Sequence, residues 1–330
     1  MAVGASHSFA QDSTRSLSLL AFGDINLGRS VGQEILKENV DFPFDSVGPI
    51  LTQADVVFAN LESQLTDQGG VTQHPQYNLI FCGPPQGARS LKRAGITVVS
   101  TANNHAYDYR RRALKETIRN LREASVQFAG TNETGDAQFA PAVVERNGIR
   151  LGVVAYTAFV NSKKGWQGYI SDFDSVRAKK EIQQLRDSVD VVVASYHGGA
   201  EYADVPDART LTDLRALADF GADVVVAHHP HVPHGVQHYK KSWIFSSLGN
   251  FVFYQPQLEW TQKSFGARVK IVKEYGTTRI AEITLLPFRS SRQPSFALPQ
   301  KEVDQIAARL RKLSNVDIHA VDGTLTVVME

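Results

Sequence analysis

The sequence predicts an α/β layered fold, in which helices pack on the faces of largely parallel sheets. Short apolar runs alternate along the chain with amphipathic helical segments, as they do in strand–helix–strand units. Several of these runs, such as 190–195 and 223–227, are rich in valine and show no polar alternation. Strands that are buried on both faces have this composition. No internal repeat or low-complexity tract favours another class.

Strands and helices alternate through the first two thirds of the chain. The expected strands lie at 16–24, 55–62, 95–105, 126–130, 149–157, 190–199 and 223–231. The expected helices lie at 110–124, 174–189 and 207–221. Apolar positions recur with a helical period in these three segments, and the two later ones lead directly into valine-rich strands.

The pattern changes near Trp243. Strands follow one another without long helices, and we expect them to be antiparallel; they lie at 242–253, 267–276 and 277–288. An amphipathic helix at 300–314 comes next, and a hairpin around Asp322 and Gly323 closes the chain.

No proline-rich or serine-rich linker divides the chain. We expect a main domain at 17–287, on which the segment 288–330 packs, and a flexible leader at 1–16. The leader lacks the basic and apolar parts of an intact signal peptide, so it is either a flexible start or the remainder of a removed signal. No apolar run approaches the roughly 20 residues of a membrane-spanning helix, and we expect no membrane span.

Composition limits the function. The formal net charge of +1 and the absence of a long basic run argue against a nucleic-acid partner. The single cysteine, Cys82, excludes an intrachain disulfide and a cysteine-rich zinc site. Any metal ion must therefore be held by histidine, carboxylate or amide side chains.

Potential metal ligands follow five of the apolar runs. They are Asp24, Glu62, Asn104 with His105, His197, and His229 with His231. Functional sites of open α/β sheets form beyond the carboxyl ends of the strands, so these side chains are expected to converge. Each residue alone has a simpler interpretation, such as a turn, a solvated carboxylate or a hydrogen-bonded histidine. The recurrence at the same end of five strands favours a metal site.

Five of the ten histidines lie between residues 228 and 238. In an extended chain, residues i and i+2 point to the same side, so His229 and His231 are predicted to face one site. Pro230 stiffens the segment between them. We interpret the remaining members as structural or peripheral, with His228 also able to orient a ligand: His228, His234 and His238.

Six blocks of the sequence, in order, resemble the poly-gamma-glutamate capsule synthesis (CapA-type) family, which is similar to the calcineurin-like metallophosphoesterases. The blocks are FGDINLGR, NLESQLT, STANNHAYDY, YHGGAEY, GADVVVAHHPHV and IFSSLGNFVF. The resemblance extends from about Leu17 to Tyr254. It implies a four-layer αββα sandwich with a centre for two divalent metal ions.

The resemblance also implies roles for single residues. The implied metal ligands are Asp24, Glu62, Asn104, His197, His229 and His231. Glu62 stands in the place of a bridging aspartate and would bind both ions. Asp24 and His231 would bind the first ion, and His197 and His229 the second. This ligand set suits Mn²⁺, Fe²⁺ or Zn²⁺ better than Mg²⁺.

His105 takes the implied role of the catalytic histidine near the leaving group. Four further residues are candidates for substrate binding or for support of the ligands: Asn26, Arg29, Asn60 and Glu201. Arg29 is either an anion-binding group or an exposed arginine at the start of a helix.

The chain departs from the family pattern at three positions. Asn26 stands where the phosphoesterases usually have histidine, so it either coordinates through its amide oxygen or leaves that place to water. Arg110 replaces a frequent glycine after the NNHxxDY motif, which alters the entrance of the following helix. Gly198 replaces a frequent tryptophan and would open the wall of the pocket.

The leading function predicted from these residues is a metal-dependent, phosphoesterase-type hydrolase in capsule or exopolymer metabolism, acting on an anionic small molecule or polymer. Two alternatives stay open: a non-catalytic, polymer-binding partner of a membrane-bound synthetase or exporter, and an amide hydrolase of gamma-glutamyl linkages. The resemblance favours a bacterial extracytoplasmic or cell-envelope location, while a cytoplasmic one stays open.

Overall fold

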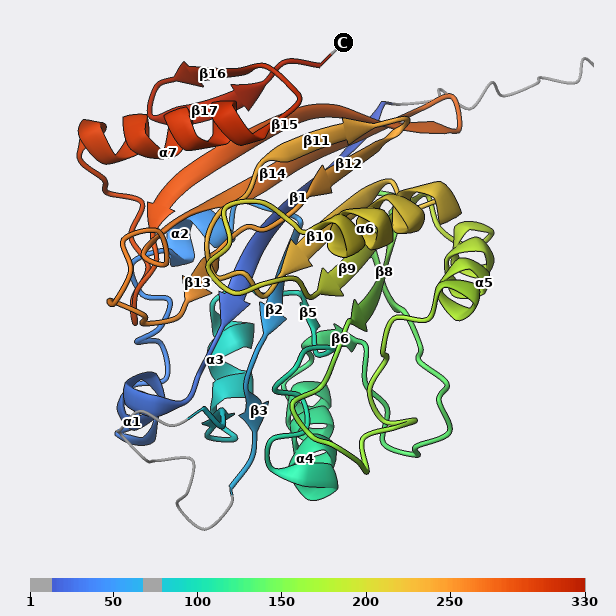
Figure 1. Cartoon of the computed structure of the whole chain (residues 1–330), viewed down its shortest axis with the longest axis vertical. Helices are drawn as coiled ribbons and strands as arrows, with labels where there is room; N and C mark the ends of the chain where they lie inside the picture. Colours follow the sequence, from blue (N-terminus) through green and yellow to red (C-terminus); the bar gives the residue numbers. More distant parts are fainter. Residues whose placement is uncertain (1–13, 68–78, 330) are drawn as a thin grey trace, which may run out of the picture.

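The computed structural model describes residues 14–67 and 79–329 and contains two large β-sheets that pack face to face (Figure 1). The first sheet has the strand order β16 (Ile318–Val321), β17 (Thr324–Val327), β15 (Thr277–Arg289), β14 (Lys263–Glu274), β1 (Arg15–Ile25), β2 (Val56–Leu61), β5 (Val98–Ser100) and β6 (Gln127–Ala129), with β13 (Asn250–Val252) paired to β1. The second has the order β11 (Val236–Tyr239), β12 (Ser242–Phe245), β10 (Val224–His228), β9 (Val191–His197), β8 (Ile149–Thr157) and β7 (Ala142–Arg146).

Helices cover the outer faces of both sheets. The helices associated with the first sheet are α1 (Arg29–Leu36), α2 (Gly48–Leu51), α3 (Gly87–Arg93) and α4 (Arg110–Glu123). The second sheet is covered by α5 (Ser175–Arg186) and α6 (Ala208–Phe220). A small ladder joins β3 (Gln64–Leu65) to β4 (Cys82–Gly83), and α7 (Gln300–Leu313) lies beside the β16–β17 hairpin (Figure 1).

The side-chain alternation along β1 shows why the molecule has four layers. Leu19 and Ala21 pack in the core between the sheets, whereas Leu20 and Phe22 pack in the core beneath the outer helices. All four are fully buried. Both faces of the strand are therefore apolar, as the unbroken apolar run indicates. The predicted αββα sandwich is confirmed.

Local sequence signals fix the ends of the two helices on the second sheet. Asp174 accepts a hydrogen bond from the backbone N–H of Arg177 at the start of α5. Asp207 does the same for Thr210 at the start of α6. Gly221 ends α6 in the left-handed conformation that glycine adopts without strain.

The strands after residue 242 differ in part from the prediction. Strands β14 and β15 are antiparallel, as expected, but β12 runs parallel to β10 and β13 runs parallel to β1. The segment between β12 and β13 carries the chain from the second sheet to the first. A pattern of apolar residues does not encode such a change of sheet.

Both ends of the chain contribute residues to the fold outside the expected main domain at 17–287. Residues 1–13 of the expected leader lie outside the described residues, and Arg15 and Ser16 already belong to β1. Near the other end, Ile306, Leu310 and Leu325 lie in the core between the sheets. Across residues 14–67 and 79–329, no helix has the length and apolar character of a membrane span.

Candidate metal centre

The strand ends of both sheets meet at one place. Strands β1, β2 and β5 are parallel neighbours in the first sheet, and β8, β9 and β10 are parallel neighbours in the second. Their carboxyl ends, marked by the arrowheads near the middle of Figure 1, therefore present their following residues to a common crevice. The register places Asp24 opposite Asn60, and His197 opposite His228.

Two groups of potential ligands share one carboxylate. The first contains Glu62, His197 and His229, and the second contains Asp24, Glu62 and His231. Within each group, one ligand atom per residue lies within 4.8 Å of the others, and all of these residues are buried. The sequence places these five residues at four different strand ends, and the tertiary structure brings them together.

Glu62 is a buried carboxylate that accepts no hydrogen bond from the part of the chain that the structure describes. It is fully buried, and neither Oε1 nor Oε2 has a partner among the described residues. Burial raises the pKa of Glu62 well above its usual range, and the negative charges of Asp24 and Glu201 raise it further. A bound cation would remove both causes, so this orphaned carboxylate fits a metal ligand.

Asp24 is held by polar neighbours on several sides. Asn60 donates from Nδ2 to Asp24 Oδ1 at 2.8 Å, and the Asp24 backbone N–H donates to the carbonyl of Gly249. Burial alone would raise the pKa of Asp24, but its contact with His231 and the nearby imidazoles of His228 and His197 bring it below its usual range. Asp24 is therefore an anion even in the buried site.

Asn250 fixes the proton on His231. Nδ1 of His231 lies 2.9 Å from Asn250 Oδ1 and 3.3 Å from Asp24 Oδ2, and both of these atoms are acceptors. The Asn250 amide is itself oriented, because its Nδ2 donates to Gln255 and Thr261. Nδ1 therefore carries the proton, which leaves Nε2 of His231, 3.9 Å from Glu62 Oε1, with a free lone pair.

His197 lies between two amide side chains. Its Nε2 donates to Asn104 Oδ1 at 2.8 Å, and its Nδ1 accepts from Asn60 Nδ2 at 3.2 Å. Burial and the neighbouring His229 keep the pKa of His197 well below its usual value. Neutral imidazole is the form that binds metals. Asn60, a candidate for substrate binding or for support of the ligands, is fully buried and donates to Asp24 and His197.

His229 and His231 reach the site through an unusual backbone. Their φ angles are 100° and 59°, in the left-handed region that is costly for residues with a Cβ atom. The segment is therefore not extended, and the predicted reason for their common direction was wrong, although both side chains lie within reach of Glu62. Nδ1 of His229 is buried without a hydrogen-bond partner among residues 14–67 and 79–329, and burial lowers the pKa of His229 to about 3.

The other histidines of the cluster divide by environment. His228 is buried with both ring nitrogens unpaired in the described structure, and its Nδ1 lies 3.6 Å from Asp24 Oδ1. Burial lowers the pKa of His228 to about 4. The ring of His234 bonds the carbonyl of Ala203, and the ring of His238 stacks on Trp243. These two face away from the ligand groups.

His105 lies at the edge of the site with a carboxylate behind it. Its Nδ1 donates to Asp108 Oδ2 at 2.6 Å, and its Nε2 lies 3.9 Å from Glu62 Oε1. The ring of Phe81 stacks on the imidazole with centroids 3.7 Å apart. The guanidinium of Arg29 lies 4.7 Å from the centroid of the same Phe81 ring, so Phe81 contacts both the arginine and the histidine.

Two predicted substrate contacts occupy different places. The amide oxygen of Asn26 accepts a hydrogen bond from the backbone N–H of Gly28 at 2.8 Å, and the side chain is buried. It shapes the turn after β1. Glu201 is exposed, and its charge acts on Glu62. Glu201 therefore belongs to the rim of the site.

Sequence reasoning did not assign roles to Asp108 and Asn250. Asp108 follows His105 by three residues in the NNHAYDY block, and Asn250 belongs to the SLGNF block. Each orients a histidine of the site through a single hydrogen bond. Both residues stand inside motifs that carry the family resemblance, so these motifs could have indicated that the two residues belong to the site.

The whole arrangement can be compared with known proteins. Residues 18–255 match the family described as bacterial capsule synthesis protein PGA_cap. The chain belongs to this capsule synthesis family. It is 32% identical over 279 residues to the capsule biosynthesis protein CapA of Bacillus anthracis, covering 82% of this chain and 67% of that protein. It is 31% identical over 322 residues to the PGA biosynthesis protein CapA of Bacillus subtilis, covering 94% and 82%.

Solved structures relate this capsule synthesis family member to a known fold. The calcineurin-like phosphoesterase YfkN from Bacillus subtilis superposes with a TM-score of 0.51 at 15% identity, covering 90% of this chain and 97% of that chain. A putative 5'-nucleotidase from Staphylococcus aureus, in complex with alpha-ketoglutarate, gives a TM-score of 0.53 at 14% identity. The match covers 82% of this chain and 54% of the staphylococcal chain, about half of its length. The capsule synthesis chain therefore has the calcineurin-like phosphoesterase fold.

Proposed function

We propose that this protein is a metal-dependent hydrolase of capsule or exopolymer metabolism, with a centre for two divalent cations. The observation that carries the proposal is the pair of ligand groups that share Glu62. One carboxylate between two sets of nitrogen and oxygen ligands suits two ions held side by side. Two of its neighbours, His197 and His229, are held neutral by burial, as coordination requires.

The ligands match borderline divalent cations. Asp24, Glu62 and His231 would hold one ion; Glu62, His197 and His229 would hold the other, with the amide oxygen of Asn104 adjacent. Mn²⁺, Fe²⁺ and Zn²⁺ all accept imidazole together with carboxylate. Bound cations would supply Lewis-acid activation of water and of the oxygen atoms on the reacting centre.

The chain's own side chains supply proton transfer and anion binding. Nε2 of His105 faces Glu62 and can hold a proton for a departing oxygen, while Asp108 orients the ring from the other side. Arg29, which contacts the same Phe81 ring as His105, brings a positive charge to this edge of the site. An anionic ester or acyl group would be drawn to this edge.

The relatives' names support the choice of substrate class. Two relatives above 30% identity are named for capsule biosynthesis and PGA biosynthesis. We propose that this chain likewise acts on an anionic polymer or its precursor, through a phosphoryl or a gamma-glutamyl carbonyl centre. A membrane-bound polymer synthetase is the corresponding proposed partner.

A polymer-binding role without catalysis is the second candidate. It is supported by Asn26, which replaces a usual ligand and whose amide oxygen is already used by the Gly28 N–H. In that case the site would hold metal and polymer without turnover.

We expect the purified protein loaded with Mn²⁺, Fe²⁺ or Zn²⁺ to hydrolyse at least one of phosphomonoesters, phosphodiesters or gamma-glutamyl amides. Metal content is measured by elemental analysis, and turnover with chromogenic esters and glutamyl anilides. Stoichiometric metal with no turnover of any substrate, combined with polymer binding, would favour the second candidate instead.

Asp108→Asn should lower turnover by about 10- to 100-fold while metal content stays at the wild-type level, because Asp108 orients His105 and touches no ligand group. The pH profile of turnover should shift, since the amide no longer stabilises a protonated imidazole. The matched control is Asp41→Asn, which removes an exposed ion pair with Arg93; neither residue belongs to the ligand groups. Loss of metal together with activity would contradict this role.

A further inference from the structure

A strongly basic face lies beside the metal centre, on α4. We call it the α4 basic face and define it by Arg110, Arg111, Arg112, Lys115, Arg119 and Arg122, all exposed. These side chains line a surface hollow of about 1110 Å³ together with Tyr107, Glu116, Glu123, Glu133 and Gly165. Six cationic and three anionic side chains leave a surplus of three positive charges. The net charge of the whole chain, +1, conceals this cluster.

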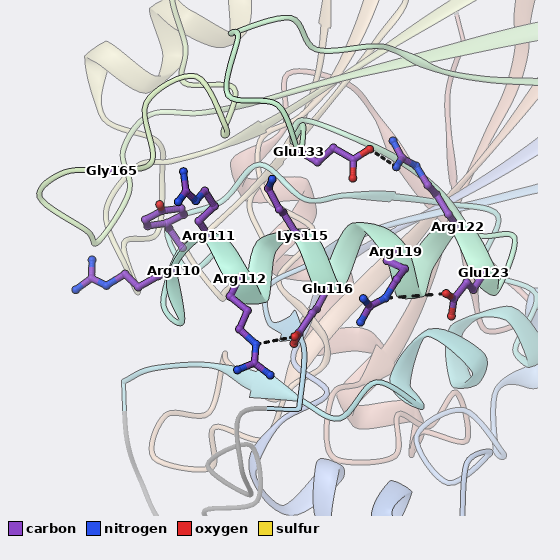
Figure 2. A pocket seen from close by; sticks show the side chains of 11 residues that line it. Arg110, Arg111, Arg112, Lys115, Glu116, Arg119, Arg122, Glu123, Glu133 and Gly165 are labelled. Carbon is purple, nitrogen blue, oxygen red and sulfur yellow. Dashed lines mark hydrogen bonds and ion pairs between the residues drawn. The ribbon is translucent and has the colours of Figure 1, made fainter.

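The uncompensated charge is concentrated at one end of the helix. Figure 2 shows the pairs Arg112–Glu116, Arg119–Glu123 and Arg122–Glu133 along α4. The remaining three cations, Arg110, Arg111 and Lys115, form no ion pair with any carboxylate in the described residues. Arg110 and Arg111 donate instead to the neutral hydroxyls of Ser162 and Tyr169.

This end of α4 is unfavourable for folding in two respects. The first turn of the helix contains three arginines and no acidic residue, although the positive end of the helix dipole favours anions. Arg110 also has φ = 64°, in the left-handed region where glycine is preferred. An exposed position where both the helix dipole and the backbone conformation disfavour the residues present indicates that these residues serve a function.

The same end is connected to the metal centre. Arg110 follows His105 by five residues, and Tyr107 between them lines the hollow. The loop 158–169 joins the two places: the Asn161 N–H donates to the carbonyl of Asn104, while Gly165 lines the hollow. In Figure 2 this loop stands beside Arg110 and Arg111.

We propose that the α4 basic face binds an extended polycarboxylate chain and positions it toward the metal centre; the choice of polymer rests on the proposed function. The helix spans about 21 Å, since each of its fourteen residues adds about 1.5 Å. It therefore offers cations to several successive carboxylates. Five of the six cations are arginines, whose planar guanidinium groups match carboxylates in a bidentate manner.

The test measures binding of a fluorescein-labelled gamma-linked glutamate oligomer by fluorescence anisotropy, with chelator present. The triple variant R110Q/R111Q/K115Q should raise Kd roughly 3- to 100-fold, because each exposed ion pair contributes a modest factor. The matched control K179Q/K180Q/K270Q removes three exposed cations from α5 and β14, and its Kd should equal that of the wild type. Equal losses in both variants would overturn the proposal.

A second variant separates binding from folding. Arg110→Gly should raise the Tm, because glycine adopts the left-handed conformation without strain, and yet weaken oligomer binding. Unchanged affinity in this variant and in the triple variant would refute the assignment. The same assay is run with single-stranded DNA and with vesicles that contain anionic lipid. If either binds more tightly than the oligomer through the same three residues, the face belongs to that polyanion instead.

Failure of this inference can be told apart from failure of the hydrolase proposal. Binding is measured without metal, whereas hydrolysis is measured with small chromogenic esters that do not reach α4. Face-dependent binding without ester turnover would retain the polymer surface and remove the hydrolase. Ester turnover, combined with oligomer binding that the α4 substitutions do not weaken, would retain the hydrolase and remove the polymer surface.

Discussion

Replacing His229 with alanine should remove divalent metal from the site and lower ester turnover by at least about 100-fold. His229 belongs to the group that contains Glu62 and His197, and its Nδ1 is buried without a hydrogen-bond partner in the described structure. Loss of one imidazole leaves that group with two ligands, and even supporting residues of metal sites cost 10- to 100-fold when they are changed. Metal content and turnover of a chromogenic phosphodiester are measured on the same sample.

The control for this substitution comes from the same histidine cluster. His238 is half-buried and stacks on Trp243 with ring centroids 4.4 Å apart, away from both ligand groups. His238→Ala should keep the wild-type metal content and turnover. A His229→Ala protein that retains both would refute the assignment of this histidine.

Replacing Glu62 with glutamine should stabilise the metal-free protein and abolish its response to metal. The carboxylate is fully buried and its oxygens have no partner in the described structure, so it is costly to keep charged. A neutral amide of the same shape costs less to bury. We expect the free energy of unfolding at neutral pH to rise by about 1–3 kcal/mol. Thermal unfolding of chelator-treated protein measures this change.

The pH dependence of this effect has a definite sign. The pKa of Glu62 in the folded protein lies well above its ordinary value of 4.5. As pH rises above 4.5, Glu62 loses its proton in the unfolded chain but keeps it in the folded protein. The metal-free wild type therefore loses stability until the pH reaches the folded pKa of Glu62. The advantage of Glu62→Gln should therefore be small below pH 4.5 and largest above the folded pKa.

Added metal should reverse the order of the two proteins. Wild-type protein gains stability by binding the cation in its folded state alone, whereas the glutamine variant lacks the shared carboxylate. Glu34→Gln is the control, because Glu34 is paired at the surface with Lys37, and its effect should stay within about 0.5 kcal/mol. A metal-induced rise in Tm that persists in Glu62→Gln would exclude Glu62 as a shared ligand.

The types of the candidate metal ligands and their places in the chain could be predicted from the sequence. Apolar runs that end in Asp24, Glu62 and His197 are local features, and the end of a buried strand is where an α/β sheet presents its functional side chains. The starts of α5 and α6 are also local features. Asp174 and Asp207 cap these helices by accepting hydrogen bonds from backbone N–H groups three residues later.

Other features depend on contacts between distant segments. The directions of β12 and β13, the left-handed backbone of His229 and His231, and the pairing of His231 with Asn250 all follow from how the two sheets meet. The sequence predicted that the two histidines point to one side because their segment would be extended. Their φ angles contradict an extended backbone. Strained conformations of this kind persist only where surrounding packing enforces them.

The sequence by itself determined which side chains could take part: the nitrogen and oxygen donors, the strands that precede them and the six cations of α4. Only the tertiary structure decided that Glu62 is shared between two groups, that Asp108 stands behind His105, and that uncompensated cations lie beside the site. Donor chemistry belongs to each residue alone, whereas distance, burial and charge compensation arise when segments far apart in the chain pack together.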